Sequence, residues 1–141
     1  MLFDGDLHLN TEDLDLREAV LEGMNLGGAH FDGANLQGAN LRSADLYWAN
    51  FFLADLTGAD LEGARLQGAD LKKANLTSAN LRNANLGRDN VGGSTSLQGA
   101  IFKSNTLKFA KLEGAEYDAN TIFPKDFDPK NFGMIERPIK K

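Results

Sequence analysis

Residues 34–63 read ANLQG ANLRS ADLYW ANFFL ADLTG ADLEG, which is six consecutive copies of one five-residue pattern. The first position of each copy is Ala, the second is Asp or Asn, and the third is Leu or Phe. The same spacing continues in both directions, so that every fifth residue from Leu16 to Val91 is apolar. Internal repeats of this kind are interpreted before any local motif, because they determine the whole architecture.

A period of five matches neither regular secondary structure. On an α-helix, successive central residues would be rotated by about 140° from one another, so no apolar face would form. On a β-strand, successive central residues would point to opposite sides of the sheet, because five is odd. The pattern therefore predicts a chain that turns once per repeat. It places Leu or Phe in a central core and Ala inward where only a methyl group fits. Gly two residues after many centres suits turns with positive φ.

These tandem copies, such as residues 34–38 (ANLQG) and 59–63 (ADLEG), resemble the pentapeptide repeat family, whose motif is A-[DN]-L-x-x. The resemblance covers residues 14–118. It implies an all-β fold, a right-handed quadrilateral β-helix with one repeat on each side, about 20 residues per coil and about five coils. The segment from Tyr117 to Met134 also resembles the tails of cyanobacterial members.

The repeat pattern divides the chain into three segments. We expect the β-helix in residues 14–118, an N-terminal cap in residues 1–13, and a C-terminal cap and tail in residues 119–141. Caps are needed because the terminal coils of a solenoid expose apolar surface. Asp128 and Gly133 predict the start and end of a short helix within the C-terminal cap. The apolar residues expected to cover the two ends are Leu2, Phe3, Leu7 and Leu9 at the start, and Phe123, Phe127 and Phe132 at the end.

The five-residue spacing fails once. After Val91 the apolar centres resume one residue late, at Leu97. We therefore expect a one-residue insertion within residues 92–96 (GGSTS), a stretch of turn residues, at a corner of the fourth coil. Under this interpretation Val91 and then Leu112 continue the column of Phe31, Phe51 and Leu71, while Leu97 continues the column of Leu16, Leu36, Leu56 and Leu76. A tolerated slip is the simpler interpretation of the insertion, and a functional loop is the alternative.

The two positions after each centre point outward, and most of them hold Gly, Gln, Ser, Thr or a charged residue. Only after two consecutive centres, Leu46 and Phe51, are both positions large and apolar. Exposed groups of this kind bury much area at a low entropic cost, so we predict a protein-interaction patch across this corner. The alternative is that these side chains pack against the N-terminal segment. The predicted patch consists of Tyr47, Trp48, Phe52 and Leu53.

A second candidate surface is acidic. Counting four repeats per coil places five acidic residues on one face, opposed only by Arg17, while the other three faces are neutral or basic. Some members of the resembled family imitate the shape and charge of duplex DNA and inhibit or protect DNA gyrase, so a modulator of gyrase or another topoisomerase is the alternative function. The predicted acidic face consists of Asp15, Glu18, Asp55, Glu116 and Asp118.

Composition limits the remaining function classes. The net charge of −5 argues against binding to nucleic acid, which favours a basic surface. The absence of Cys excludes disulfides, thiolate metal sites and Cys nucleophiles. No apolar run approaches the roughly 20 residues of a membrane helix. Because the N-terminus also lacks a signal sequence, we expect a cytoplasmic protein that makes no membrane contact.

No motif predicts catalysis. The sequence contains no phosphate-binding loop, nucleophile elbow or zinc-ligand spacing. Polar side chains on the convex faces of a solenoid diverge, whereas catalysis needs titratable groups that converge in a pocket. We therefore expect a non-enzymatic interaction or scaffolding module with no catalytic, metal or cofactor site. Its partner would be another protein, and the sequence leaves open whether the module forms a homodimer.

Overall fold

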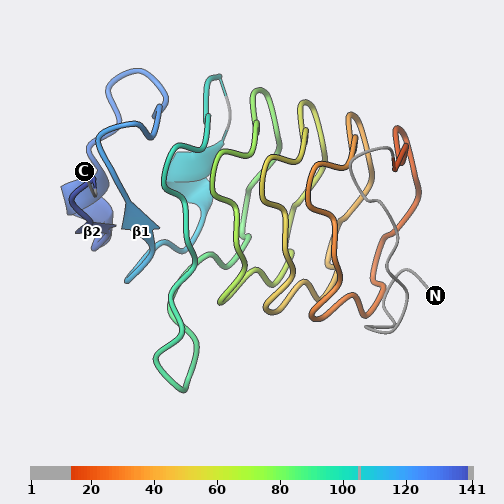
Figure 1. Ribbon diagram of the computed structural model, residues 1–141, viewed down its shortest axis with the longest axis horizontal. Helices are drawn as coiled ribbons and strands as arrows, with labels where there is room; N and C mark the ends of the chain where they lie inside the picture. Colours follow the sequence, from red (N-terminus) through yellow and green to blue (C-terminus); the bar gives the residue numbers. More distant parts are fainter. Residues whose placement is uncertain (1–13, 105, 140–141) are drawn as a thin grey trace.

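The computed structural model describes residues 14–104 and 106–139, which form a rod of stacked, four-sided coils (Figure 1). Parallel bridges join equivalent residues of neighbouring coils, as in Asp15↔Asn35 and Asn35↔Asp55, so that one coil contains 20 residues. Backbone hydrogen bonds hold the coils together; the Leu16 N–H, for example, donates to the Asn35 carbonyl oxygen at 2.8 Å. The predicted β-helix is confirmed.

Each side of a coil is a short extended segment followed by a turn. In the repeat around Phe51, the Ala54 N–H donates to the Phe51 carbonyl oxygen at 2.9 Å and closes the turn. The Asn50 side chain accepts a hydrogen bond from the Phe52 N–H at 2.9 Å, which explains the preference for Asp or Asn before each centre. Leu53 has a φ of 59°, the left-handed conformation that a type II turn requires at this position.

The core follows the predicted columns through the first three coils. Bridges align the repeats of Leu16, Leu36, Leu56 and Leu76 on one side of the rod. On another side the Phe31 and Phe51 rings stack with their centroids 5.1 Å apart. From Ala29 to Ala84 the alanines between the centres are buried, as the small inward position requires.

The fourth coil departs from the prediction. Asp70 pairs with Ser96, which is 26 residues later instead of 20, so the chain inserts six residues, 89–94. They form a loop that projects from the rod (the green loop in Figure 1). Val91 lies in this loop and is 86 % exposed, whereas Leu97 is buried and continues the column of Leu71. The predicted one-residue insertion and the central role of Val91 are therefore wrong.

Later columns shift by one side as a consequence. Leu112 continues the column of Leu86, because Asn85 pairs with Lys111. Leu97, predicted to follow Leu76, instead follows Leu71, and Phe102 follows Leu76 because Asn75 pairs with Ile101. Tyr117 comes after Leu97 in the same column, as predicted, since Ser96 pairs with Glu116.

Threonine replaces the inward alanine where the chain re-enters the coil. Thr95 follows the loop, is fully buried, and donates its hydroxyl hydrogen to the Leu66 carbonyl oxygen at 3.0 Å. Thr121 follows a one-residue insertion between the fifth coil and the cap, and donates to the Leu97 carbonyl oxygen at 3.0 Å. In both places a hydroxyl group bonds to the backbone of the preceding coil.

The C-terminal segment covers the last coil. The 3₁₀ helix η3 (Pro129–Phe132) begins after Asp128, whose side chain accepts from the Lys130 N–H, and ends at Gly133 with a φ of 71°, as predicted. Phe127 stacks on Phe123 and Phe132 at centroid distances of 5.1 and 4.6 Å, and all three rings are half-buried. The remaining elements are η2 (Leu107–Phe109), β1 (Glu116–Tyr117) and β2 (Ile135–Glu136), and β1 pairs with β2 in parallel. The predicted N-terminal cap lies outside the described residues.

Candidate interaction surface

The five residues of the predicted acidic face do not share one face. Asp15 and Asp55 lie in the row of Asn35, whereas Glu116 lies in the row of Asp70 and Ser96, on a different side of the rod. The reason is the six-residue loop, which moves every later repeat by one side. The predicted acidic face is therefore wrong.

Two of these carboxylates also form ion pairs with neighbouring arginines. The Arg17 guanidinium lies 2.7 Å from the Asp15 carboxylate, and its hydrogen bond lowers the pKa of Asp15 to about 2. The Arg137 guanidinium lies 2.8 Å from the Glu116 carboxylate, and this hydrogen bond lowers the pKa of Glu116 below its ordinary value. Both carboxylates are consequently ionised at neutral pH, within ion pairs.

The four residues of the predicted patch are the central residues of two consecutive turns of the second coil. Trp48 is 52 % exposed and Leu53 is 55 % exposed, while Tyr47 and Phe52 are half-buried. We call these four residues the aromatic patch. Its apolar surface is in contact with solvent on two neighbouring sides of the rod, at the corner where they meet.

The backbone of the aromatic patch is strained. Trp48 and Leu53 have φ values of 60° and 59°, in the left-handed region. This conformation costs a residue with a side chain roughly 1–2 kcal/mol. The equivalent positions of the neighbouring coils, before and after Trp48, are Gly28 and Gly68, which avoid the cost. The turn itself therefore does not require a large side chain at either position.

The 89–94 loop packs on Trp48. A Cβ atom added at Gly93 would lie only 2.5 Å from the indole Cζ2 atom, so the loop backbone lies directly against the ring. A Cβ atom added at Gly68, one coil further along, would lie 2.8 Å from the indole Cε2 atom. Two glycines thus make room for the indole. Trp48 and the loop that begins at Asp89 both depart from the repeat, and they are in contact although they are 41 residues apart in the sequence.

Hydrogen bonds close the loop at its base. Asp89 is 7 % exposed, and its carboxylate accepts from the Val91 N–H at 3.0 Å and the Gly93 N–H at 2.5 Å. The Asp89 N–H donates to the Gly93 carbonyl oxygen at 2.9 Å. The loop therefore has a fixed base and presents Val91 to solvent. The sequence carried a signal for it, since Asp89 stands where the repeat has Ala.

Cationic side chains border the aromatic patch. The Arg65 guanidinium lies 5.8 Å from the Tyr47 ring centre, and the Lys73 ammonium lies 6.0 Å from the Phe52 ring centre. These distances are at the limit of a cation–π interaction, so each contributes little in an exposed position. The cations nevertheless define the polar edge of the patch.

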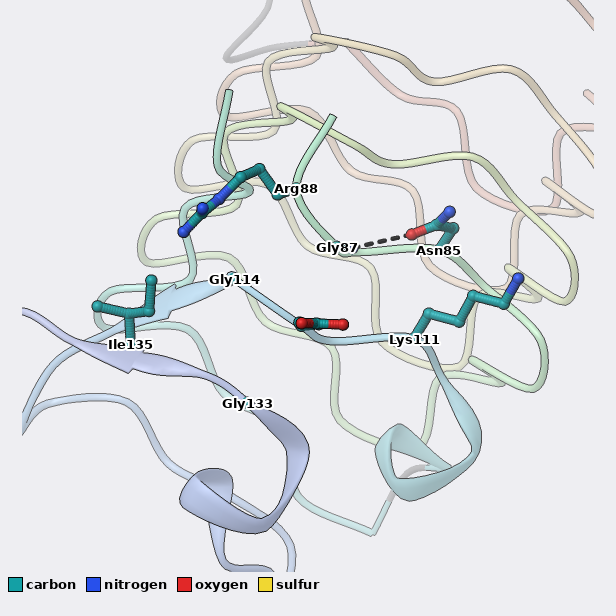
Figure 2. A pocket seen from close by; sticks show the side chains of 8 residues that line it. Asn85, Gly87, Arg88, Lys111, Gly114, Gly133 and Ile135 are labelled. Atoms are coloured by element: carbon teal, nitrogen blue, oxygen red, sulfur yellow. Dashed lines mark hydrogen bonds between the residues drawn. The ribbon is translucent and has the colours of Figure 1, made fainter. Parts of the chain in front are cut away.

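A hollow of about 380 Å³ lies on the same side of the rod as Tyr47, towards the C-terminus. Figure 2 shows that the Arg88 and Lys111 side chains point away from each other, so their charges do not converge on one point. Three of its eight lining residues are glycines. Its lining residues are Asn85, Gly87, Arg88, Lys111, Glu113, Gly114, Gly133 and Ile135.

Residues 14–104 and 106–139 contain neither a metal-binding cluster nor a membrane-spanning helix. In this part of the chain, no group of three or more His, Cys, Asp or Glu side chains is arranged to hold a metal ion. The same residues include no helix of the length and apolarity that crossing a bilayer takes.

Comparison with known proteins identifies related sequences and structures. The family model described as pentapeptide repeats matches residues 15–51 and 54–88, in eight copies. A pentapeptide repeat protein from the Arabidopsis thaliana thylakoid lumen is 36 % identical over 80 % of this chain and 70 % of that chain, with a TM-score of 0.52. No curated protein sequence is significantly similar to this chain.

Two cyanobacterial structures are also similar. HetL from Nostoc sp. strain PCC 7120, a pentapeptide repeat protein involved in heterocyst differentiation regulation, is 27 % identical over 76 % of this chain and 53 % of HetL, with a TM-score of 0.48. A pentapeptide repeat protein from Cyanothece 51142 is 30 % identical over 77 % of this chain and 90 % of that chain, with a TM-score of 0.45.

Proposed function

The chain belongs to the pentapeptide repeat family, and on that premise we propose that it is a non-enzymatic module that binds a protein partner through the aromatic patch. Proteins of this family are generally structural or interaction modules. The observation that carries the proposal is the exposure of Trp48 and Leu53 at turn positions with positive φ. Neighbouring coils use glycine at the positions equivalent to Trp48.

The energetics favour a role in binding over a role in folding. Each of these two side chains leaves about half of its surface in water and strains its own turn. A partner that covers the exposed half would gain the transfer free energy that folding does not use, roughly 25 cal/mol for each Å² of apolar area. Tryptophan and tyrosine are also enriched among the residues that dominate binding energy at protein interfaces.

The alternative, a modulator of DNA gyrase, has less support. Imitation of duplex DNA needs a long acidic surface, and the carboxylates predicted to form it lie on different sides of the rod. Two of them, Asp15 and Glu116, are paired with arginine.

A photo-cross-linking experiment tests the proposal. The cross-linking amino acid p-benzoylphenylalanine replaces Leu53 in one protein and Ser104 in a matched control. Both residues occupy the second outward position after a Phe centre and have positive φ. We expect a defined protein to cross-link in cells of the source organism at position 53 and not at position 104. Identical products at both positions, or none at position 53, would contradict the proposal.

The purified partner then allows a quantitative test. The pair Phe52→Ala and Leu53→Ala leaves the contact between Trp48 and Gly93 in place, and the pair Lys103→Ala and Ser104→Ala is its control. We expect the first pair to weaken binding by at least about 30-fold, equivalent to about 2 kcal/mol, and the control to leave it unchanged. Equal affinities of the two pairs would remove the aromatic patch from the interface.

A further inference from the structure

The loop and Trp48 form one continuous surface. Because the Gly93 backbone lies against the indole ring, the exposed part of Trp48 and the tip of the loop border each other. We call Trp48 and residues 89–94 the Trp48–loop ridge. Any partner that covers Trp48 in the aromatic patch also encounters this loop.

The ridge presents an apolar side chain on a fixed base. Val91 is 86 % exposed, and no packing within the rod explains an apolar residue there. Its N–H is held by the buried Asp89 carboxylate, so the loop is ordered before a partner arrives. Preorganisation of this kind lowers the entropic cost of binding.

Cations stand beside the ridge in a protein whose net charge is −5. The Arg65 side chain is 59 % exposed, and its ion pair with Asp45 is long, at 3.5 Å. Arg88, at the start of the loop, is exposed and has no ion-pair partner among residues 14–104 and 106–139. The nearby Asp89 carboxylate is buried and accepts the Val91 and Gly93 N–H groups, and it forms no ion pair with Arg88 at the surface. The local surface is suited to carboxylates.

The dimensions fit an extended peptide. From Trp48, the corresponding turn positions of the next coils are Gly68, Arg88 and Gly114, and Gly133 follows in the cap. Four steps of about 4.8 Å span about 19 Å, the length of about six extended residues at 3.3 Å each. Three of these positions are glycines, Gly68, Gly114 and Gly133. The Trp48 ring lies over the first, the Arg88 side chain over the second and the Glu113 side chain over the third, so a peptide laid along this path contacts these side chains.

We infer that the partner segment is an acidic, extended peptide of about six residues, bound along the Trp48–loop ridge and towards the hollow. An apolar side chain of the peptide packs against Trp48 and Val91, and its carboxylates face Arg65 and Arg88. Glu113 lines the hollow with Arg88 and Lys111 and offsets part of their charge, so the acidic residues lie at the end nearer Trp48. The inference rests on the proposed function and adds the chemistry of the partner to it.

Selection from a random peptide display library tests this chemistry. The wild-type protein serves as bait, and a variant lacking residues 89–94 is used for counter-selection. The deletion joins Arg88 directly to Thr95 and restores the 20-residue coil, with Thr95 at the inward position. We expect the selected peptides to share a net negative charge and an aromatic or branched aliphatic residue. Neutral or basic peptides, or no enrichment over the counter-selected pool, would overturn the inference.

Point variants guard against a deletion that fails to fold. A synthetic peptide from the selection should bind at least tenfold more weakly to Val91→Ser and to Arg88→Glu, and binding should weaken as salt is raised from about 0.05 to 0.3 M. Lys103→Glu, on another side of the rod, is the matched charge control and should bind as the wild type does.

The outcomes separate this inference from the proposed function. Peptides that depend on Phe52 and Leu53, but not on Val91 or Arg88, would overturn the acidic-peptide inference and leave the aromatic patch as an interface. A protein that dimerises in size-exclusion chromatography, and loses the dimer on deletion of the loop, would identify a second copy as the occupant and also overturn the inference.

Discussion

Two corners of the rod have the same turn conformation in the second and third coils and carry different side chains. The small corner consists of Ser43, Gly63 and Asn83, and the Trp48 corner consists of Trp48, Gly68 and Arg88, followed by the loop. Ser43 and Trp48 have φ values of 54° and 60°, and each turn is closed by the N–H of the next alanine. The fold therefore determines the turn and the inward residues, and it leaves the outward corner free. The proposed function attributes to binding what the Trp48 corner adds beyond the fold.

The largest expected effect concerns the inward residues, which both corners share. Leu61 lies two residues before Gly63, the small corner of the third coil, and is fully buried. Leu61→Ala removes its packing and leaves a cavity, so we expect a loss of about 2–5 kcal/mol in the free energy of unfolding. Denaturant unfolding measures the loss.

The outward control for this change is Gln67→Ala. Gln67 is half-exposed on the next side of the coil, so the substitution should change stability by less than about 0.5 kcal/mol. Comparable losses for the two variants would contradict the division between inward and outward positions.

Adding a methyl group should destabilise the Trp48 corner more than the small corner. Gly68→Ala strains a turn with a φ of 75° and drives a Cβ atom into the Trp48 indole ring. Gly63→Ala strains an equivalent turn, with a φ of 68°, but meets only the Ser43 hydroxyl at 3.3 Å. We expect both to be destabilising, and Gly68→Ala by about 1–3 kcal/mol more, from overpacking. Thermal or denaturant unfolding gives the difference.

A double-mutant cycle assigns that difference to the indole. In a Trp48→Ala background, Gly68→Ala should cost about as much as Gly63→Ala, because the ring is no longer there to clash. A difference that persists without the indole would mean that another contact limits the space at Gly68.

Removing the side chain at each corner gives a smaller effect. Ser43→Gly relieves the left-handed strain at the cost of a more flexible unfolded chain, so we expect a gain of about 0.5–1 kcal/mol. Trp48→Gly relieves the same strain but removes the indole from Gly68 and Gly93. We therefore expect Trp48→Gly to gain less than Ser43→Gly, and hydrogen exchange in residues 89–94 to accelerate. An equal gain with unchanged exchange would mean that Trp48 does not hold the loop.

The regular part of the fold could be predicted because the residues within each repeat determine its turn and its inward positions. Every inward position within residues 26–86 is Ala, Leu or Phe, and all are buried. The helix η3 in the C-terminal cap could also be predicted from nearby residues, since Asp128 caps its start and Gly133 forms the turn at its end. Such features depend on neighbours in sequence, and a pattern reveals them.

The loop could not be predicted in the same way. Val91 happens to stand five residues after Leu86, so the apolar spacing continued by coincidence into a segment that leaves the core. Thr95 reveals the true re-entry point only through its bond to the Leu66 carbonyl oxygen, which belongs to the preceding coil. The aromatic patch was identified as a candidate, but its contact with Gly93 depends on how far the loop folds back.

The smallest expected effect is a loss of stability at low pH, which we expect in the C-terminal cap and not at the Trp48 corner. Hydrogen bonding from Arg137 lowers the pKa of Glu116 below its ordinary value of 4.5. A lowered pKa in the folded state means that the ion pair stabilises β2 fully above pH 4.5, and that this contribution is lost as the pH falls through the lowered value. Because the Arg137 side chain is 51 % exposed, solvent screens the pair, and we expect it to be worth less than about 1 kcal/mol.

On acidification, hydrogen-exchange protection should fall at the Arg137 N–H, which donates to the Tyr117 carbonyl oxygen, and stay constant at the Trp48 N–H. Glu116→Gln should abolish the difference between the two amides, and a parallel loss of protection at both in the wild type would show that acid loosens the whole rod instead of the cap.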